Sequence, residues 1–208
     1  MKNNEFGRSM IEMLSVLAIV GILSVGSISG YTNAMLKYRV NKLSYQTLEI
    51  IVNIRNLYLK EKDYKGIDLD LLSKVGVIPT DMYKRPGFVS QIFNAFNGNV
   101  KVFESKNGDD RILAFEIYNT KITTKGCIAL ATQDWGTDPT SGFTALYIGS
   151  EDVSTPQMQD IVIGSLSNMD EGIFTVGVHQ HNIPLDVVEA TQACNCGPNN
   201  CVVGIKYR

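Results

Sequence analysis

The stretch NNEFGRSMIEMLSVLAIVGILSVGSISGY, residues 3–31, decides the organisation of this chain. A short polar leader ends in glycine, a long apolar run follows, and one acid, Glu12, stands at the entrance to that run. No charged side chain occurs between Glu12 and Lys37, so the run is long enough to cross a hydrocarbon core of about 30 Å as a helix. A carboxylate in the bilayer core costs roughly 2.5–3.5 kcal/mol. We therefore expect a membrane segment over about residues 10–34, in which Glu12 requires a partner.

The apolar pattern continues beyond the membrane segment with the period of a helix. Steps that alternate between four and three residues place the apolar side chains on one face. No proline occurs before Pro79, so the pattern predicts one helix over residues 8–60, with an amphipathic second half and with Gly66 as its C-terminal cap. The apolar positions of that second half are Leu36, Val40, Leu43, Ile50, Ile54 and Leu57.

Residues 61–208 are expected to form a globular domain with a disulfide-bonded C-terminal region. A short helix is predicted in DLDLLSKVG, residues 68–76, with Asp68 as its N-cap, and a second helical turn is favoured in residues 183–194. Segments rich in Val, Ile, Phe and Tyr predict strands, with KNGDD as a hairpin turn after the first of them. These strands are expected at residues 99–105, 111–119, 127–133, 143–149, 173–179 and 201–208. The fold class is therefore α+β, a long N-terminal α-helix packed on an antiparallel β-sheet.

The four cysteines all follow the membrane segment, and three of them form the pattern Cys-x-Cys-x4-Cys near the end: Cys194, Cys196 and Cys201. In an exported domain such a cluster favours disulfides. A Cys194–Cys196 bond would close a very tight ring, so Cys127 is expected to bond one of the C-terminal group while the other two join locally. A bond from Cys127 to Cys194 or Cys201 would close a loop of about 70 residues, worth about 4 kcal/mol. A zinc site is the alternative, although Cys-x-Cys lacks the usual two-residue spacer.

The balance of 19 basic and 21 acidic residues leaves no basic stripe, so nucleic-acid binding is not expected. His179 and His181 in HQH are read as the end of a surface strand rather than a metal site. Asp134, Asp186 and Glu189 are read as turn and helix-surface residues. The chain has no nucleophile motif and no phosphate loop, so we expect no enzyme activity, no catalytic residue, no metal and no cofactor.

The N-terminal residues resemble the class III signal of type IV prepilins. The matching features are Gly7 as the cleavage residue, Arg8 as the new N-terminus, Glu12 as the fifth residue of the mature chain, and the apolar MLSVLAIVGIL after it. Farther along, LLSKVGVIP, the predicted sheet and a mid-chain cysteine that can bond one near the end resemble type IVb pilins. The chain departs from the pilin pattern at Arg8, where an apolar N-methylated residue is usual, and it has no proline in its membrane helix.

The resemblance implies a structural subunit of a type IV pilus or pilus-like filament. A prepilin peptidase would remove residues 1–7, and an inner-membrane assembly platform would polymerise the subunits through their N-terminal helices. Glu12 would then pair with the amine of Arg8 on a neighbouring copy, which selects one axial register. The precursor would lie in the inner membrane with a cytoplasmic N-terminus and a periplasmic C-terminal domain. In type IVb pilins the disulfide-bonded region forms much of the filament surface, which makes Trp135 and the loop GTDPTSG candidates for exposed contacts.

Three alternatives remain at this stage. The nearest is a pseudopilin of a type II secretion or DNA-uptake system. Another is an exported binding protein or enzyme with an ordinary signal peptide cut near VGSIS, which the position of Glu12 and the continuous amphipathic helix disfavour. The third is an uncut domain tethered to the membrane.

Overall fold

The structure is a computed structural model of the whole chain. It describes residues 6–84, 91–108, 111–136, 138, 140–150, 153–163, 171–177, 183–197 and 200–208. The chain divides into two compact units, Met1–Tyr38 and Arg39–Arg208. The long helix α1 (Phe6–Leu57) contributes to both units.

In the first unit every described residue belongs to α1. The helix also has no interruption in the second unit, because the chain has no proline before Pro79 that would break its hydrogen bonds. It ends at Leu57, three residues before the expected end at Lys60. The prediction that Gly66 caps this helix was wrong. Gly66 lies beyond the end of the helix with φ +79°, and its N–H donates to Glu104 Oε2 at 2.8 Å.

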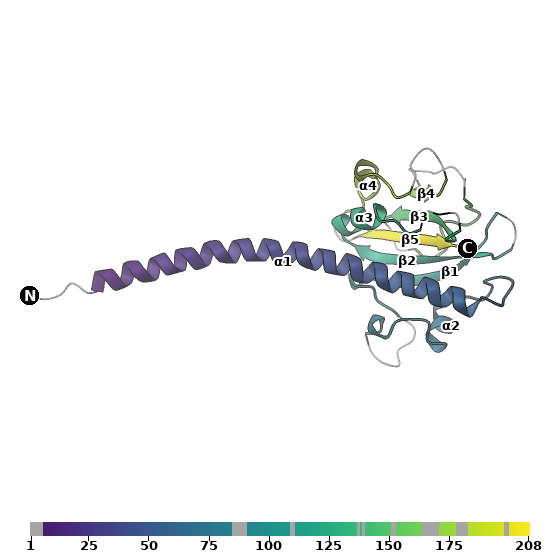
Figure 1. Cartoon of the computed structure of the whole chain (residues 1–208), viewed down its shortest axis with the longest axis horizontal. Coiled ribbons are helices and arrows are strands. Elements are labelled where there is room, and N and C mark those ends of the chain that lie inside the picture. Colours follow the sequence, from purple (N-terminus) through teal and green to yellow (C-terminus); the bar gives the residue numbers. More distant parts are fainter. Residues whose placement is uncertain are drawn as a thin grey trace, which may run out of the picture. The chain divides into compact units, whose positions relative to one another are not determined.

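The second unit is built on one five-stranded antiparallel sheet in the order β1-β2-β5-β3-β4 (Figure 1). The C-terminal strand β5 therefore lies at the centre, between β2 and β3. This sheet confirms the predicted fold class. The strands are β1 (Val100–Ser105), β2 (Ala114–Ile122), β3 (Phe143–Gly149), β4 (Ile173–Thr175) and β5 (Cys201–Tyr207).

One face of the sheet packs against α1 from Arg39 onward. Val40, Leu43, Ile50 and Ile54 of the predicted apolar stripe are all buried, each worth about 1.5–3 kcal/mol when removed from water. One buried polar contact also joins the helix to the sheet, because Asn119 Nδ2 donates to Thr47 Oγ1 at 3.3 Å. The amphipathic half of α1 is thus one wall of the core.

The opposite face of the sheet is covered by residues 153–163, here called the strap. Within the strap, Val153 and Met158 pack with Tyr118, Ala145 and Val202 in one apolar cluster. Lys101 Nζ donates to the carbonyl of Val153 at 2.6 Å and thereby fixes one end of the strap. The sheet is therefore buried on both faces.

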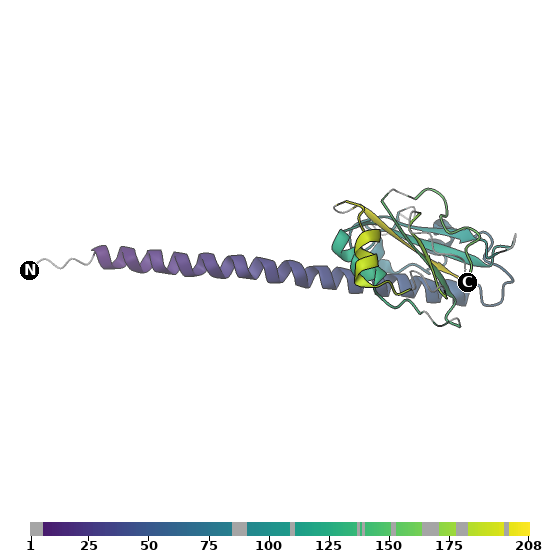
Figure 2. The same cartoon turned by 90° about the horizontal axis from the view of Figure 1, so that it is seen from above.

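Four short helices complete the fold: α2 (Leu69–Lys74), the 3₁₀ helix η1 (Thr80–Met82), α3 (Thr124–Ala131) and α4 (Val187–Ala193). The predicted helix after residue 68 and the predicted helix in residues 183–194 are confirmed, and Asp68 caps α2 by accepting from Leu71 N at 2.7 Å. Figures 1 and 2 show α3 and α4 beside each other at one end of the sheet.

The predicted strand at residues 127–133 was wrong, because this segment lies largely in α3. Thr123 caps the helix by accepting from Gly126 N at 3.1 Å. The buried positions of the helix, Gly126, Cys127, Leu130 and Ala131, recur with helical rather than alternating spacing. Of the predicted hairpin turn KNGDD, residues 109 and 110 lie outside the described residues, although β1 and β2 do pair antiparallel.

Candidate functional site

The apolar surface of α1 in the first unit is the feature that sets this chain apart from an ordinary globular domain. Large apolar side chains from Met10 to Tyr31 are exposed all round the helix, from 52% for Val20 to 76% for Ile22. Within the described residues, one helix is long and apolar enough to cross a membrane, and its most apolar window has a mean hydropathy of 2.2. Such a surface is unstable in water, so lipid or other protein must cover it.

The hydroxyl groups of this segment are bonded within the helix. Ser24 Oγ donates to Val20 O and Ser27 Oγ donates to Leu23 O, each at 2.7 Å, and Thr32 Oγ1 donates to Ser29 O at 2.9 Å. A hydroxyl that bonds its own backbone leaves no donor that must find a partner outside the helix. The surface is therefore suited to an apolar environment despite its serines.

The glycines of this segment are not required by packing within the chain. A Cβ at Gly21, Gly26 or Gly30 would meet nothing within 4 Å. Each glycine destabilises the helix by about 1 kcal/mol relative to alanine. No contact among the described residues at these positions offsets that penalty. Small residues allow the close approach of a neighbouring helix, and among the described residues of this chain none lies close to these three positions.

The predicted processing and assembly residues all lie in α1. Gly7 and Arg8 are helical by their backbone, and Glu12 is an exposed residue one turn farther along. The Ser15 hydroxyl donates to the carbonyl of Glu12 at 2.8 Å. Cleavage after Gly7 and the pairing of Glu12 stay predictions.

The cysteines form two disulfides, Cys127–Cys194 and Cys196–Cys201, with sequence separations of 67 and 5. The first joins α3 to the end of α4, and the second joins the loop after α4 to the first residue of β5. In the chain-entropy model the two bonds stabilise the fold by about 4 and about 2 kcal/mol. Mid-chain and C-terminal cysteines are thus bonded to each other, while the two remaining cysteines close a local ring.

A buried polar network fixes the strap to the sheet. Glu116 on β2 is fully buried, and its carboxylate accepts from Ser105 Oγ at 2.5 Å, from the Tyr118 hydroxyl, and from the backbone N–H groups of Gln157 and Met158 at 3.1 Å each. Lys206 on β5 lies directly opposite Glu116 in the strand register, and its Nζ donates to the carbonyl of Met158 at 2.6 Å. Two buried side chains on the same face of the sheet therefore bind Met158 in the middle of the strap, Glu116 at its N–H and Lys206 at its carbonyl.

Burial shifts the pKa values of this network. Desolvation lowers the pKa of Lys206 to about 8, while the neighbouring carboxylates of Glu116 and Asp160 oppose that shift. Desolvation and the adjacent Glu116 raise the pKa of Tyr118 far above its ordinary value, so that its hydroxyl stays a donor. The charged side chains of this network are closed off from solvent, because Glu116 and Lys206 are each 0% exposed and Lys206 Nζ donates to the carbonyls of Lys106 and Met158 at 2.6 Å each.

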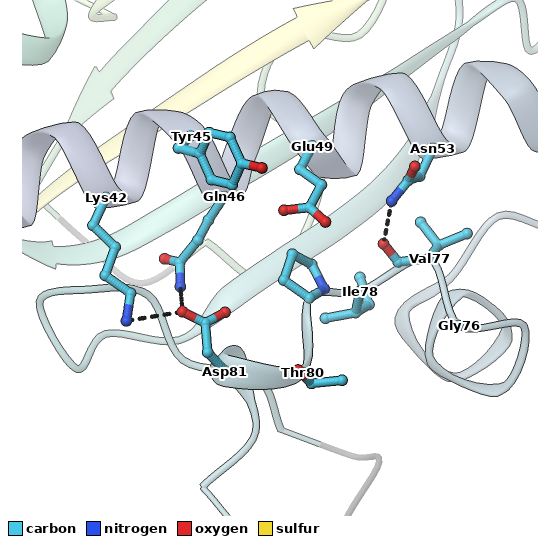
Figure 3. A pocket seen from close by; sticks show the side chains of 11 residues that line it. Lys42, Tyr45, Gln46, Glu49, Asn53, Gly76, Val77, Ile78, Thr80 and Asp81 are labelled. Carbon is cyan, nitrogen blue, oxygen red and sulfur yellow. Dashed lines mark hydrogen bonds and ion pairs between the residues drawn. The ribbon is translucent and has the colours of Figure 1, made fainter.

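A hollow of about 390 Å³ lies between the packed half of α1 and residues 76–81. Figure 3 shows Lys42 and Gln46 of α1 reaching down to Asp81, and Asn53 reaching to the carbonyl of Val77. The Lys42 Nζ to Asp81 Oδ2 distance is 2.8 Å, and Gln46 Nε2 donates to the same oxygen at 2.9 Å. These bonds account for how residues 76–81 are attached to the helix.

Trp135 was predicted as an exposed contact, and this prediction was wrong. The side chain is 2% exposed, and its Nε1 donates to the carbonyl of Leu130 at 2.9 Å. The hydroxyl of Tyr207 donates to the carbonyl of Trp135 at 2.5 Å, so the residue joins α3 to the central strand. In the loop GTDPTSG, residues 137 and 139 lie outside the described residues.

The other polar residues singled out in the sequence have structural surroundings where they are described. Asp186 is the N-cap of α4 and accepts from Val188 N and Glu189 N at 2.8 Å each, and Asp134 accepts from Gly136 N at 2.8 Å. His179 and His181 lie outside the described residues. Among the described residues, the group of metal-binding types that lies close together is Cys127, Cys196 and Cys201, and disulfides occupy these sulfurs.

Sequence reasoning missed the Glu116 and Lys206 network. A signal was present, because an acid in AFEIYN and a lysine in VVGIKY interrupt two apolar strands. The alternation of side chains along a strand places both residues on one face of the sheet. A face with charged residues is predicted to be exposed to solvent unless another segment is known to cover it. The strap has no regular secondary structure, so the residues that cover this face carry no pattern of their own.

The model of the PilS N-terminal family matches residues 37–206 of this chain. The chain is 27% identical over 136 residues to the major structural subunit of bundle-forming pilus of Escherichia coli O127:H6, covering 65% of this chain and 68% of that protein. The same protein of Escherichia coli O111:H- matches equally.

Two solved structures share the fold. TcpA, a type IV pilin from Vibrio cholerae El Tor biotype, has a TM-score of 0.57 at 13% identity, over 82% of this chain and 99% of that one. The type IV b pilin from Salmonella typhi has a TM-score of 0.50 at 15% identity, over 83% and 99%. This chain has the fold of a type IV pilin and belongs to the PilS N-terminal family.

Proposed function

We propose that this chain is the structural subunit of a type IV pilus or a similar filament. A prepilin peptidase cleaves the precursor after Gly7, and the assembly platform of the inner membrane polymerises the mature subunits through α1. The observation that carries the proposal is the apolar surface from Met10 to Tyr31, which is exposed all round in the single chain. The likeness to the bundle-forming pilus subunits supports the same function.

The proposed assembly gives that surface two successive environments. In the precursor it lies in the lipid, with the N-terminus in the cytoplasm and the domain beyond Arg39 in the periplasm. In the filament the helices of neighbouring copies replace the lipid. The internal bonds of Ser24 and Ser27 suit both environments, since neither demands a polar partner outside the helix.

Glu12 makes the assembly specific. It is the single charged side chain between Arg8 and Lys37, and a buried carboxylate without a partner costs several kcal/mol. Cleavage after Gly7 creates a new amine at Arg8, and in our proposal this amine pairs with Glu12 of the next copy. A copy in the wrong register would bury both charges unpaired, so one register is selected.

The first test is the N-terminal sequence and intact mass of the protein recovered from its native membrane and surface fractions. A chain that begins at Arg8 supports processing as a prepilin. A start near Ile28 would mean an ordinary signal peptide and would refute the proposal. An intact Met1 in the surface fraction would do the same.

The second test is assembly. Glu12→Val is expected to remove filaments from the sheared surface fraction, as seen by electron microscopy, while membrane insertion and the folded domain remain. Glu49→Gln is the matched control, because it also removes one glutamate from α1, but in the half that packs on the sheet. Filaments of normal yield from Glu12→Val would exclude the assigned role of Glu12.

A further inference from the structure

The two disulfides lie side by side. The Sγ atoms of Cys127, Cys196 and Cys201 are all within 4.8 Å of one another, so one sulfur of the first bond lies close to both sulfurs of the second. The fourth cysteine is also near, because Cys201 Sγ lies 3.7 Å from the carbonyl oxygen of Cys194. Both bonds therefore belong to one cluster at the end of the sheet where α3 and α4 meet (Figures 1 and 2).

Access to this cluster is uneven. Cys127, Cys194 and Cys201 are each 0% exposed, whereas Cys196 is partly exposed between the exposed residues Asn195 and Gly197. A thiol in solution must collide with a sulfur along the axis of its disulfide, and exposure decides which sulfur it reaches. A thiol in solution can therefore reach Cys196, whereas the Cys127–Cys194 bond is buried.

We propose that the four cysteines form a thiol–disulfide exchange centre, in which Cys196–Cys201 is the entry through which a small thiol reaches the buried Cys127–Cys194 bond. The partner is any low-molecular-weight thiol, with glutathione as the probe. This goes beyond the proposed pilus function and does not depend on it.

The exchange runs in two balanced steps. A thiolate attacks Cys196 Sγ, forms a mixed disulfide with it, and expels Cys201 as a thiolate. The Cys201 thiolate then attacks Cys127 Sγ and expels Cys194 as a thiolate, which takes up a proton from water. The second step conserves the number of disulfides, because the Cys127–Cys201 bond replaces Cys127–Cys194 and nothing is oxidised or reduced.

Position favours Cys201 as the relay. It is the first residue of the central strand β5, so the sheet holds it in place, and its sulfur lies within 4.8 Å of Cys127 Sγ. The exchanged bond would tie α3 directly to β5 and free the end of α4. The same route run backwards would convert a wrongly paired Cys127–Cys201 intermediate into the native pairing during folding.

The decisive experiment uses the full chain in detergent with less than one equivalent of glutathione, followed by acid quenching, alkylation and peptide mass spectrometry. We expect glutathione on Cys196, alkylated Cys194, and a cross-linked Cys127–Cys201 peptide in the same population. The proposal is overturned if Cys201 is the alkylated residue throughout, or if glutathione is found first on Cys127 or Cys194.

Two variants provide the kinetic test. In Cys196→Ser/Cys201→Ser the remaining Cys127–Cys194 bond should be reduced by glutathione at least about tenfold more slowly than in the wild type. In Cys127→Ser/Cys194→Ser the Cys196–Cys201 bond should be reduced at the wild-type rate, because the entry is unchanged. Fluorescence of Trp135 checks that both variants remain folded before the reaction starts. Equal rates for the buried bond with and without the second disulfide would refute the relay.

Discussion

Replacing Glu116 by glutamine tests whether the buried carboxylate fixes the strap. The side chain keeps its shape in Glu116→Gln, and one oxygen can still accept from Gln157 N, Met158 N and the Tyr118 hydroxyl. The other oxygen becomes an NH₂ group, which can no longer accept from Ser105 Oγ. The substitution thus removes the charge and one acceptor without opening a cavity.

The magnitude follows from these bonds. A hydrogen bond to a charged group is worth about 1.5–3 kcal/mol and a neutral one about 0.5–1.5 kcal/mol, so each weakened bond loses roughly 1–1.5 kcal/mol and the three together lose roughly 3–4.5 kcal/mol. Lys206, which lies opposite Glu116, also loses its neighbouring negative charge. We expect the free energy of unfolding to fall by at least about 3 kcal/mol, the lower end of the sum over the three weakened bonds.

The assay is urea unfolding of the full chain in detergent, followed by the fluorescence of Trp135, the chain's single tryptophan. This probe suits the measurement because the indole is buried between α3 and the central strand. The control is Asp70→Asn, which also removes one carboxylate charge but from an exposed ion pair with Lys74, and it should cost less than about 0.5 kcal/mol. If Glu116→Gln unfolds within about 0.5 kcal/mol of the wild type, the carboxylate does not hold the strap and our reasoning fails.

Three further outcomes follow from the second unit. Burial lowers the pKa of Lys206 to about 8, so above that pH the unfolded chain binds a proton that the folded chain lacks. The free energy of unfolding should therefore rise from about pH 8 to 10 in the wild type. Urea midpoints should show this rise in the wild type but not in Lys206→Met. Removing the longer disulfide in Cys127→Ser/Cys194→Ser should lower the unfolding free energy by about 4 kcal/mol, and a loss below about 1 kcal/mol would contradict the loop-entropy argument. Gly98→Ala should unfold at clearly lower urea than the wild type, because the new Cβ would lie 1.7 Å from the Thr120 carbonyl oxygen, and an unchanged midpoint would show that this close approach is not rigid.

The local periodicity of apolar residues was enough to predict much of the fold. The helical stripe through Leu43, Ile50 and Ile54 is buried where the pattern placed it, because a regular spacing of apolar residues needs only one partner surface. The closing strand CVVGIKYR became β5, although its central place in the sheet could not be read from the sequence. Strand order depends on which faces meet in three dimensions, and no local pattern records it.

The failures lie where a segment's partners are distant in sequence. The apolar run CIALATQ suits a strand or a buried helix equally, and the cap at Thr123 together with the bond from Cys127 to Cys194 decided for the helix. Trp135 was expected on the surface because the disulfide-bonded region forms much of the filament surface in the type IVb pilins that the chain resembles. Its burial results from contacts with Leu130 and Tyr207, one of which lies more than seventy residues away.

The two units differ in whether their side chains find partners within the chain. In the domain beyond Arg39, the buried charged side chains of Glu116 and Lys206 have their hydrogen-bond partners within the chain, so these two groups need no partner from a neighbouring copy. The helix before Tyr38 has its hydroxyls bonded internally but its apolar side chains exposed, and its glycines meet nothing. Its stability must therefore come from neighbours outside the chain. The polymerisation that we propose needs such a division: in that proposal the domain stays folded while the helix exchanges lipid for copies of itself.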